Sequence, residues 1–199
     1  LEQSADAIAY YWKALEVNPR SFTALAGLET IYRREMEWED VIGVMQRRAD
    51  ILEETSDRIE QLLAIARVHE DELENPVGGA SALEQILEME PLHDYAFNRL
   101  EAIYAVNEMW DELYALYSQR AASIAEVPDS PQFLAKEHVY WMRKAGFVNE
   151  HKIGNLEEAF EMYQYAWLAD FTDNEAVAEL ENVARQLERF EILAHQAGE

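Results

Sequence analysis

The chain has 199 residues, 49% of them hydrophobic, and a formal net charge of −24. This apolar content is enough for a large core, so the composition argues against disorder. The acidity argues against binding to nucleic acid or to an anionic membrane surface, because both require a basic face. Cysteine is absent, which excludes disulfides and thiolate metal sites and leaves the cellular compartment open.

No apolar run approaches the ~20 residues that a membrane-spanning helix needs, so we expect no direct insertion into a membrane. The first residue is Leu rather than Met. We therefore interpret the chain as part of a longer protein, in which neighbouring repeats of the same parent could be partners.

Taken in order, the chain reads as a series of short amphipathic helices. Ala, Glu and Leu dominate the sequence, and most of the few Gly and Pro residues stand where helices would end. The predicted helices span residues 1–19, 21–34, 38–54, 55–73, a segment ending at 89, 93–106, 109–126, 132–151, 155–169, 173–187 and 189–197.

Local signals set several of these boundaries. Ser21 is a predicted N-cap, and Thr55, Ser56 and Asp57 offer caps for the fourth helix. Asn75-Pro76 and Gly78-Gly79 are interpreted as a break. The segment 127–131, Val-Pro-Asp-Ser-Pro, is the strongest loop signal in the chain.

A repeated unit organises the chain. The stretch Leu25–Val41 returns as Phe97–Leu113 and again, weakened, as Val177–Leu193. Each copy places an apolar residue, Leu-Glu, an aliphatic, an aromatic and a second aliphatic at the same offsets. Those offsets give one apolar side to each of two short helices, so one unit is a helix–turn–helix.

With these helical pairs, the chain resembles the tetratricopeptide repeat (TPR) family. In that family a small residue, an aromatic, a small residue and a proline punctuate the second helix of each pair. The matching positions are Ala7, Tyr11, Ala14 and Pro19; Ala159, Tyr163 and Ala166; and, more loosely, Gly79, Leu83, Ile86 and Pro91. The resemblance covers almost the whole chain, although its pattern is degenerate, and half-a-TPR arrays are the alternative family.

The resemblance implies an all-α fold: a right-handed α-solenoid of about eleven antiparallel helices, forming one domain over residues 1–199. The first helix of each pair would line a concave face. The family has a small residue after the central Leu of that first helix. Ala66 and Gly146 supply it in the even repeats, whereas Glu29, Glu101 and Glu181 replace it in the odd ones. The working unit is thus a double repeat of two unlike hairpins.

The odd repeats also carry an arginine at a second position where the family has small residues. Glu29 and Arg48 stand at the same two repeat positions as Glu101 and Arg120. We therefore predict that Glu29–Arg48 and Glu101–Arg120 are partly shielded ion pairs that join the two helices of each odd hairpin.

No catalytic or cofactor-binding pattern is visible. The histidines lack the spacing of helical metal ligands, and His69-Glu70-Asp71-Glu72 is interpreted as an acidic helix end. Gly78-Gly79 lacks the lysine and later glycine of a phosphate-binding loop. We expect no enzyme activity, no metal and no cofactor.

Aromatic residues at equivalent repeat positions are interpreted as core: Tyr32 with Tyr104, and Trp38, Trp110 and Phe190. Family groove positions supply different candidates, and the partner-binding residues we single out are Arg33, Arg34, Arg67, Tyr95, Asn98, Tyr140, Arg143 and Phe147.

The groove positions together hold as many bases as acids: Arg33, Arg34, Arg67, Arg143 and Arg185 against Glu60, Glu70, Asp71, Glu150 and Glu175. This count predicts a groove near neutrality, and it does not favour a basic peptide. The function expected from the resemblance is a scaffold that binds a protein or peptide along the concave face or through the array ends. The alternative is an architectural spacer in a very long repeat protein.

Overall fold

The computed structural model describes residues 2–126 and 132–189, which contain ten α-helices, one π-helical turn and no strand. Contacts divide the chain into two compact units, Leu1–Glu90 and Pro91–Glu199. The first unit comprises α1 (Glu2–Val17), α2 (Phe22–Glu35), α3 (Trp38–Ile51), α4 (Thr55–Asp71) and α5 (Pro76–Met89). The second comprises α6 (Asp94–Val106), α7 (Trp110–Ala125), α8 (Gln132–Val148), the π-helical Asn149–Ile153, α9 (Leu156–Ala169) and α10 (Asn174–Gln186).

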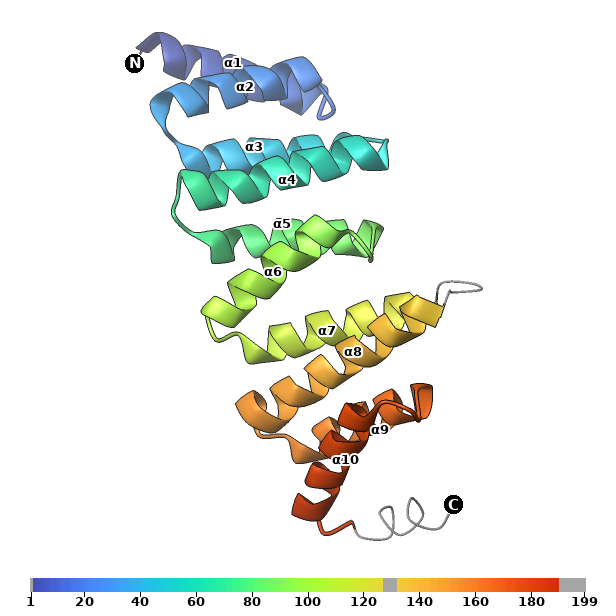
Figure 1. Ribbon diagram of the computed structural model, residues 1–199. Helices are drawn as coiled ribbons and strands as arrows, with labels where there is room; N and C mark the ends of the chain where they lie inside the picture. The colour runs from blue at the N-terminus through green and yellow to red at the C-terminus, as the bar shows by residue number, and fades with distance from the viewer. Residues whose placement is uncertain (1, 127–131, 190–199) are drawn as a thin grey trace. The chain divides into compact units, whose positions relative to one another are not determined.

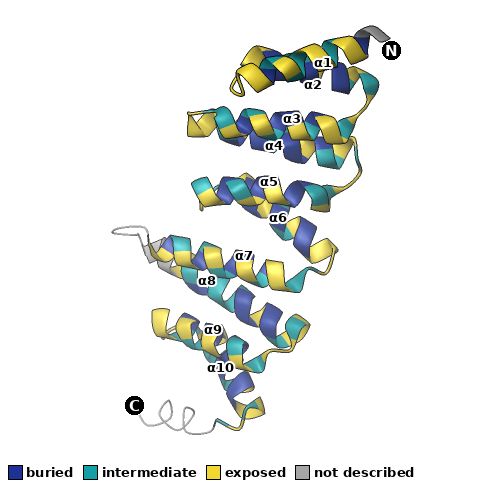
Figure 2. Ribbon diagram, turned by 180° about the vertical axis from the view of Figure 1, so that it is seen from behind, coloured by how far each residue is buried: buried dark blue, intermediate teal, exposed yellow. Residues whose placement is uncertain are grey.

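Within each unit, successive helices pack side by side as hairpins (Figure 1). Buried residues lie where neighbouring helices of a unit face one another (Figure 2). The predicted all-helical fold, built from helical hairpins, is therefore confirmed for the described residues. The predicted loop at 127–131, the helix at 189–197 except for Arg189, and Phe190 lie outside them.

The Ser21 cap is confirmed, whereas the predicted caps of α4 and the predicted break at Gly78-Gly79 need correction. Ser21 accepts a hydrogen bond from the Ala24 amide at 3.3 Å. The N-cap of α4 is Glu54, without a side-chain bond, and Thr55 is already helical. The predicted break at Gly78-Gly79 lies inside α5, because Asn75 caps that helix and Pro76 occupies its first turn.

Small residues let neighbouring helices approach closely. A Cβ added at Gly79 would stand 3.2 Å from Ala66 Cα, so α5 rests almost directly on the α4 backbone. A Cβ at Gly146 of α8 would stand 2.6 Å from the Tyr163 ring of α9. That ring is fully buried, and its hydroxyl donates to Glu150 at 3.0 Å.

The repeated unit ends its first helix in the same way in each copy. Met36, Glu108 and Glu188 all have left-handed backbones, with φ of 59°, 57° and 58°. The next residue then donates its amide hydrogen back into the helix, as Glu37 does to the Tyr32 carbonyl at 3.0 Å. This cap turns the chain within a few residues and confirms the repeat period that the sequence predicts.

The aromatic residues predicted to be core differ in burial. Tyr32 and Tyr104 are 8% and 3% exposed, which confirms their assignment. Trp38 and Trp110 are only half-buried. The Lys152 ammonium lies over the Trp110 ring, 4.7 Å from its centroid, so one side of this tryptophan is available to a cation.

The first predicted ion pair is present. Arg48 Nη1 donates to Glu29 Oε2 at 2.7 Å, and Arg33 Nε donates to the other oxygen of the same carboxylate at 3.0 Å. The Glu29 side chain is 16% exposed and that of Arg48 is 33% exposed. One partly shielded carboxylate therefore holds two arginines, from α2 and α3.

The second predicted pair, Glu101–Arg120, is wrong. Glu101 instead accepts the Tyr117 hydroxyl at 2.7 Å, whereas Arg120 donates to Asp94 at 2.5 Å and lies over the Phe97 ring. The reason is three replacements at equivalent repeat positions. Tyr117 stands where the first copy has Met45, Phe97 where it has Leu25, and Asp94 where it has Phe22.

A double-mutant cycle distinguishes the two hairpins. Glu29→Gln and Arg48→Met should show a coupling free energy of about 1–2 kcal/mol, between the values for exposed and buried pairs. Glu101→Gln and Arg120→Met should add to within ~0.5 kcal/mol, because these side chains do not bond to each other. Urea unfolding of the four single and two double variants measures both. A coupling in the second hairpin as large as in the first would contradict the assignment.

The glycine contacts give a prediction with an internal control. Gly146→Ala should lower the free energy of unfolding by about 1–2 kcal/mol, since overpacking against the buried Tyr163 ring outweighs the gain in helix propensity. Gly43→Ala in α3, where an added Cβ meets nothing within 4 Å, should raise it by about 0.5–1 kcal/mol. Thermal unfolding of both variants checks the pair. Stabilisation by both substitutions would show that the α8–α9 contact can expand.

Candidate functional site

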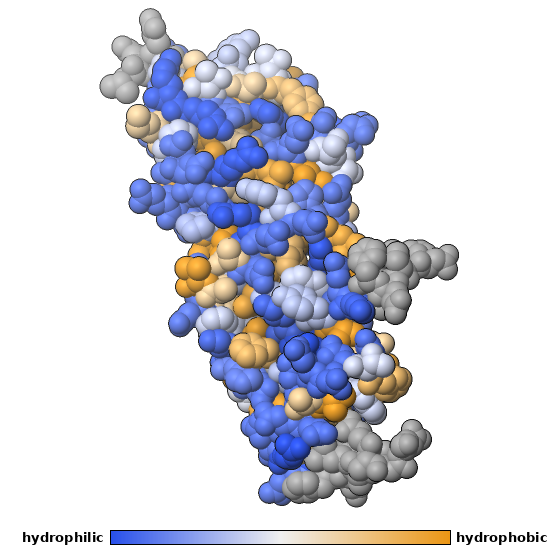
Figure 3. All heavy atoms as spheres, viewed as in Figure 1, coloured by the Kyte–Doolittle hydropathy of each residue, from blue (hydrophilic) through white to orange (hydrophobic). Residues whose placement is uncertain are grey.

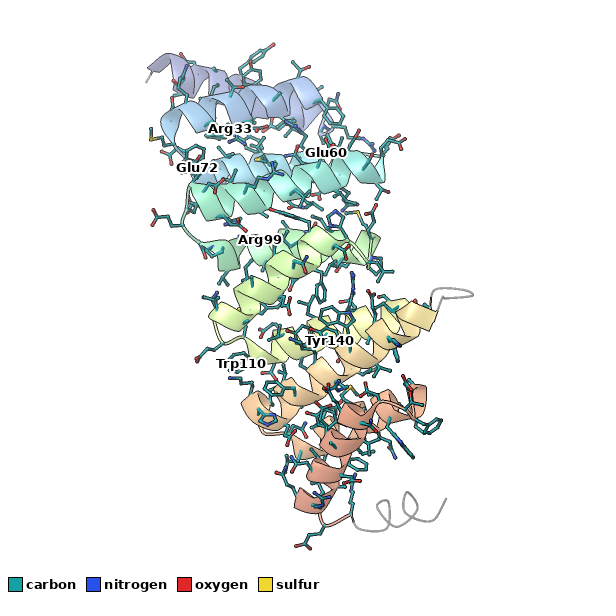
Figure 4. All side chains as sticks on the ribbon, in the orientation of Figure 1. Arg33, Glu60, Glu72, Arg99, Trp110 and Tyr140 are labelled. Atoms are coloured by element: carbon teal, nitrogen blue, oxygen red, sulfur yellow. The ribbon has the colours of Figure 1, made fainter. Side chains whose placement is uncertain are left out.

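The arginines predicted for the groove of the first unit do not converge on one site. Arg33 bonds to Glu29, while Arg34 donates to the Ser4 hydroxyl at 2.8 Å and pairs with Glu35 at 3.4 Å. Arg67 lies exposed on α4. Figure 4 shows Arg33 on α2 and Glu60 on α4, within the same unit. Two of the three arginines are therefore already engaged by the chain itself.

In the second unit, three predicted residues meet in one hollow, which we call the α8–α10 groove. Its volume is about 320 Å³, and it is lined by Tyr140, Arg143, Lys144 and Phe147 of α8 with Glu175 and Glu179 of α10. The predicted residues Tyr95 and Asn98 are exposed on α6 and do not line it.

Arg143 is fixed at the centre of this groove. Its Nε and Nη2 donate to the two oxygens of Glu179 at 2.6 and 2.8 Å, a bidentate geometry. Nη1 lies 2.8 Å from Glu175 and 3.7 Å from Asp173. The hydrogen bond to Glu179 raises the pKa of the Arg143 guanidinium, with burial opposing it and Glu175 adding to the rise. Arg143 is therefore a permanent cation that ties α8 to α10.

Two aromatic side chains flank Arg143 on the same face of α8. Tyr140 is 47% exposed and packs edge-on against Trp141, with ring centroids 4.8 Å apart. Phe147 is 46% exposed and stacks on His151 at 4.4 Å. Each ring is therefore held by an aromatic neighbour while about half of its residue surface remains exposed. Both were singled out from the sequence, and the structure places them seven residues apart, two helical turns, along one groove.

Trp141 supports this surface from beneath. It lies 4.8 Å from the Phe97 ring and 5.5 Å from the Tyr117 ring, between α6, α7 and α8. Burial, and then the hydrogen bond to Glu101, raises the pKa of the Tyr117 hydroxyl, which therefore stays protonated and donates. Tyr140 is thus backed by a packed aromatic layer of helical residues.

Sequence reasoning missed Lys144, Glu179 and Trp141. Glu179 follows the predicted groove residue Glu175 by one helical turn, so helix geometry alone places it on the same face. Lys144 is adjacent to Arg143, and its ammonium lies 5.6 Å from the Tyr140 ring centroid. No sequence pattern singles out Trp141, because its role depends on the packing of three helices.

The first unit contains a second hollow, which we call the α2–α4 pocket. It is lined by Phe22, Ala26, Arg48, Leu52, Asp57, Glu60, Gln61 and Ala64, and its volume is about 520 Å³. Like the α8–α10 groove, it opens between first helices of successive hairpins. Each unit thus has a hollow lined by residues of its first helices.

The equal count of bases and acids at groove positions does not describe the charge that a ligand would meet. Arg33, Arg143 and Arg185 are each bound by a glutamate outside the counted set: Glu29, Glu179 and Glu181, respectively. These three arginines therefore meet a ligand with an internal carboxylate already bound to each of them.

Within the described residues, no three side chains of the metal-ligating types gather in one place. None of the helices in the described part of the chain is both long and apolar enough to cross a membrane. Figure 3 shows that hydrophilic side chains cover most of the face in view, with hydrophobic patches between them.

No protein-family model and no curated protein sequence matches the chain. The solved structures similar to it include YrrB, titled a TPR protein with an unusual peptide-binding site. YrrB has 19% identity and a TM-score of 0.35, covering 89% of this chain and 83% of that one. They also include MamA, with 14% identity and a TM-score of 0.35, covering 85% and 93%.

The tie between α8 and α10 should depend on the guanidinium fork. Arg143→Lys keeps the charge but loses the bidentate bond, so it should lower the free energy of unfolding by about 1–2 kcal/mol. Arg185→Lys, at the exposed pair with Glu181, should change it by less than ~0.5 kcal/mol. Urea unfolding compares them. Equal effects would mean that Arg143 contributes no more than a surface charge.

Proposed function

We propose that this chain is a protein-interaction scaffold that binds a peptide segment of a partner protein on the faces of its first helices. The α8–α10 groove is one contact site. The observation that carries the proposal is the pair of half-exposed rings, Tyr140 and Phe147, flanking an immobilised Arg143 in a hollow of about 320 Å³.

The rings suit an interface on energetic grounds. Aromatic residues are enriched at protein interfaces and contribute strongly when fully covered. Covering the open half of each ring would contribute about 2 kcal/mol at ~25 cal/mol per Å². Tyr140 is supported by Trp141 and Phe147 by His151, so little side-chain entropy is lost when a partner binds.

The polar groups of the groove would orient a bound partner rather than catalyse a reaction. Arg143 is occupied by Glu179 and Glu175, whereas the Lys144 ammonium lies over the Tyr140 ring, 5.6 Å from its centroid. A partner chain can place an apolar side chain on the rings and an acceptor at Lys144. We assign no catalytic step to this arrangement.

A matched pair of double variants tests the proposal. Tyr140→Ser with Phe147→Ser should reduce retention of partner proteins from the source lysate by about tenfold or more, because both anchors are lost. The control, Tyr165→Ser with Phe171→Ser, removes two aromatics that are 53% and 63% exposed outside the groove and should retain them. Circular dichroism verifies that both variants are folded. Retention of the same proteins by the groove variant as by the wild type would refute the α8–α10 groove as a contact site.

A further inference from the structure

The α2–α4 pocket has an apolar wall and a polar mouth. Phe22 is 47% exposed and, with Ala26, Leu52 and Ala64, forms the apolar part of the lining. Asp57 and Glu60 of α4 are exposed residues that line the same hollow. A volume of about 520 Å³ accommodates one long side chain together with the backbone that carries it.

Gln61 brings a polar group to the lining of this pocket. Its residue is only 6% exposed, it lines the pocket, and its side-chain amide has no hydrogen-bond partner within the described part of the chain. The amide offers both a donor and an acceptor, which match the carbonyl and N–H groups of an extended peptide backbone.

The charges of the lining are not balanced once the internal pairs are assigned. Arg48 is the cation of the lining, and it is held by Glu29 at 2.7 Å. Asp57 and Glu60 form no ion pair with any described residue. A ligand that enters the pocket therefore meets two available carboxylates beside an apolar wall.

The alternative ligands fit less well. An acidic side chain or chain terminus would face Asp57 and Glu60, with only an already paired arginine to neutralise it. A purely apolar side chain would cover the wall but leave both carboxylates without a counter-charge. A lysine or arginine satisfies both features, because its aliphatic stem packs on apolar surface while its head reaches the carboxylates.

We propose that the α2–α4 pocket binds a cationic side chain, lysine or arginine, of an extended peptide segment, with the Gln61 amide bonded to that segment's backbone. The stem lies along Phe22 and Ala26, and the head lies at Asp57 and Glu60. This inference rests on the proposed function, to which it adds a ligand chemistry for the first unit.

Nuclear magnetic resonance with small probes tests the pocket directly. Capped Ala-Ala-Arg-Ala-Ala should cause saturable shifts in the amides of residues 57–64 and in the Gln61 side-chain amide at millimolar concentrations. The same peptide with citrulline, which is isosteric but neutral, should bind about tenfold more weakly. A tenfold loss corresponds to about 1.4 kcal/mol.

Matched variants separate the pocket from the general attraction of an acidic chain. Asp57→Asn with Glu60→Gln should abolish the preference for arginine over citrulline. Asp6→Asn with Glu16→Gln on α1, which removes the same charge at exposed positions outside the pocket, should preserve it. The spectrum of each variant reports its fold.

Equal shifts from the arginine and citrulline peptides, shifts that avoid Gln61, or no saturable shift would each overturn the inference. So would an equal loss of the preference in both double variants. The peptide titration tests the α2–α4 pocket of the first unit, whereas the Tyr140 and Phe147 variant tests the α8–α10 groove of the second. If the arginine peptide does not bind the pocket but the Tyr140 and Phe147 variant loses its partner proteins, the scaffold function is supported and the cationic ligand is refuted.

Discussion

The close approach of neighbouring helices at small residues is the constraint on which the rest of this structure depends. Ala66 against Gly79 and Tyr163 against Gly146 bring helices to separations that a larger side chain at either glycine would prevent. Each hairpin has an apolar side that only a neighbour can cover, so these contacts decide which surfaces remain open. The open surfaces are faces of first helices, where both the α2–α4 pocket and the α8–α10 groove lie.

Identical repeat positions do not guarantee identical interactions. Arg48 and Arg120 are equivalent, yet Arg48 joins two helices through Glu29 while Arg120 binds Asp94. An arginine side chain can reach several acceptors, and the surrounding side chains determine which of them the guanidinium bonds to. Tyr117 donates to the Glu101 carboxylate, and Arg120 bonds to Asp94 instead of to Glu101. Two of the Arg120 nitrogens are buried without a hydrogen-bond partner among the described residues, and their desolvation opposes folding.

The distribution of charge has consequences for binding that the net charge of −24 conceals. In the α8–α10 groove, Arg143 is neutralised by Glu179 and Glu175 and acts as a structural tie. In the α2–α4 pocket, Arg48 is likewise occupied, whereas Asp57 and Glu60 remain available. A cation held by an internal carboxylate is a poor ligand group, because a partner must first displace that carboxylate and then compensate for its desolvation.

Four features could be predicted from the sequence alone: the helices, most of their boundaries, the 72-residue return of the odd hairpin from Leu25 to Phe97, and the groove-facing rings Tyr140 and Phe147. These features follow from local spacing, since apolar periodicity, caps and turns act within a few residues. Three others required the packed helices: the position of Gly78-Gly79 within α5, the bond from Arg143 to Glu179, and the Gln61 amide in the lining of a pocket. Such outcomes depend on side chains that meet from different helices, and charges or amides with several possible partners are assigned only when packing fixes the distances among them.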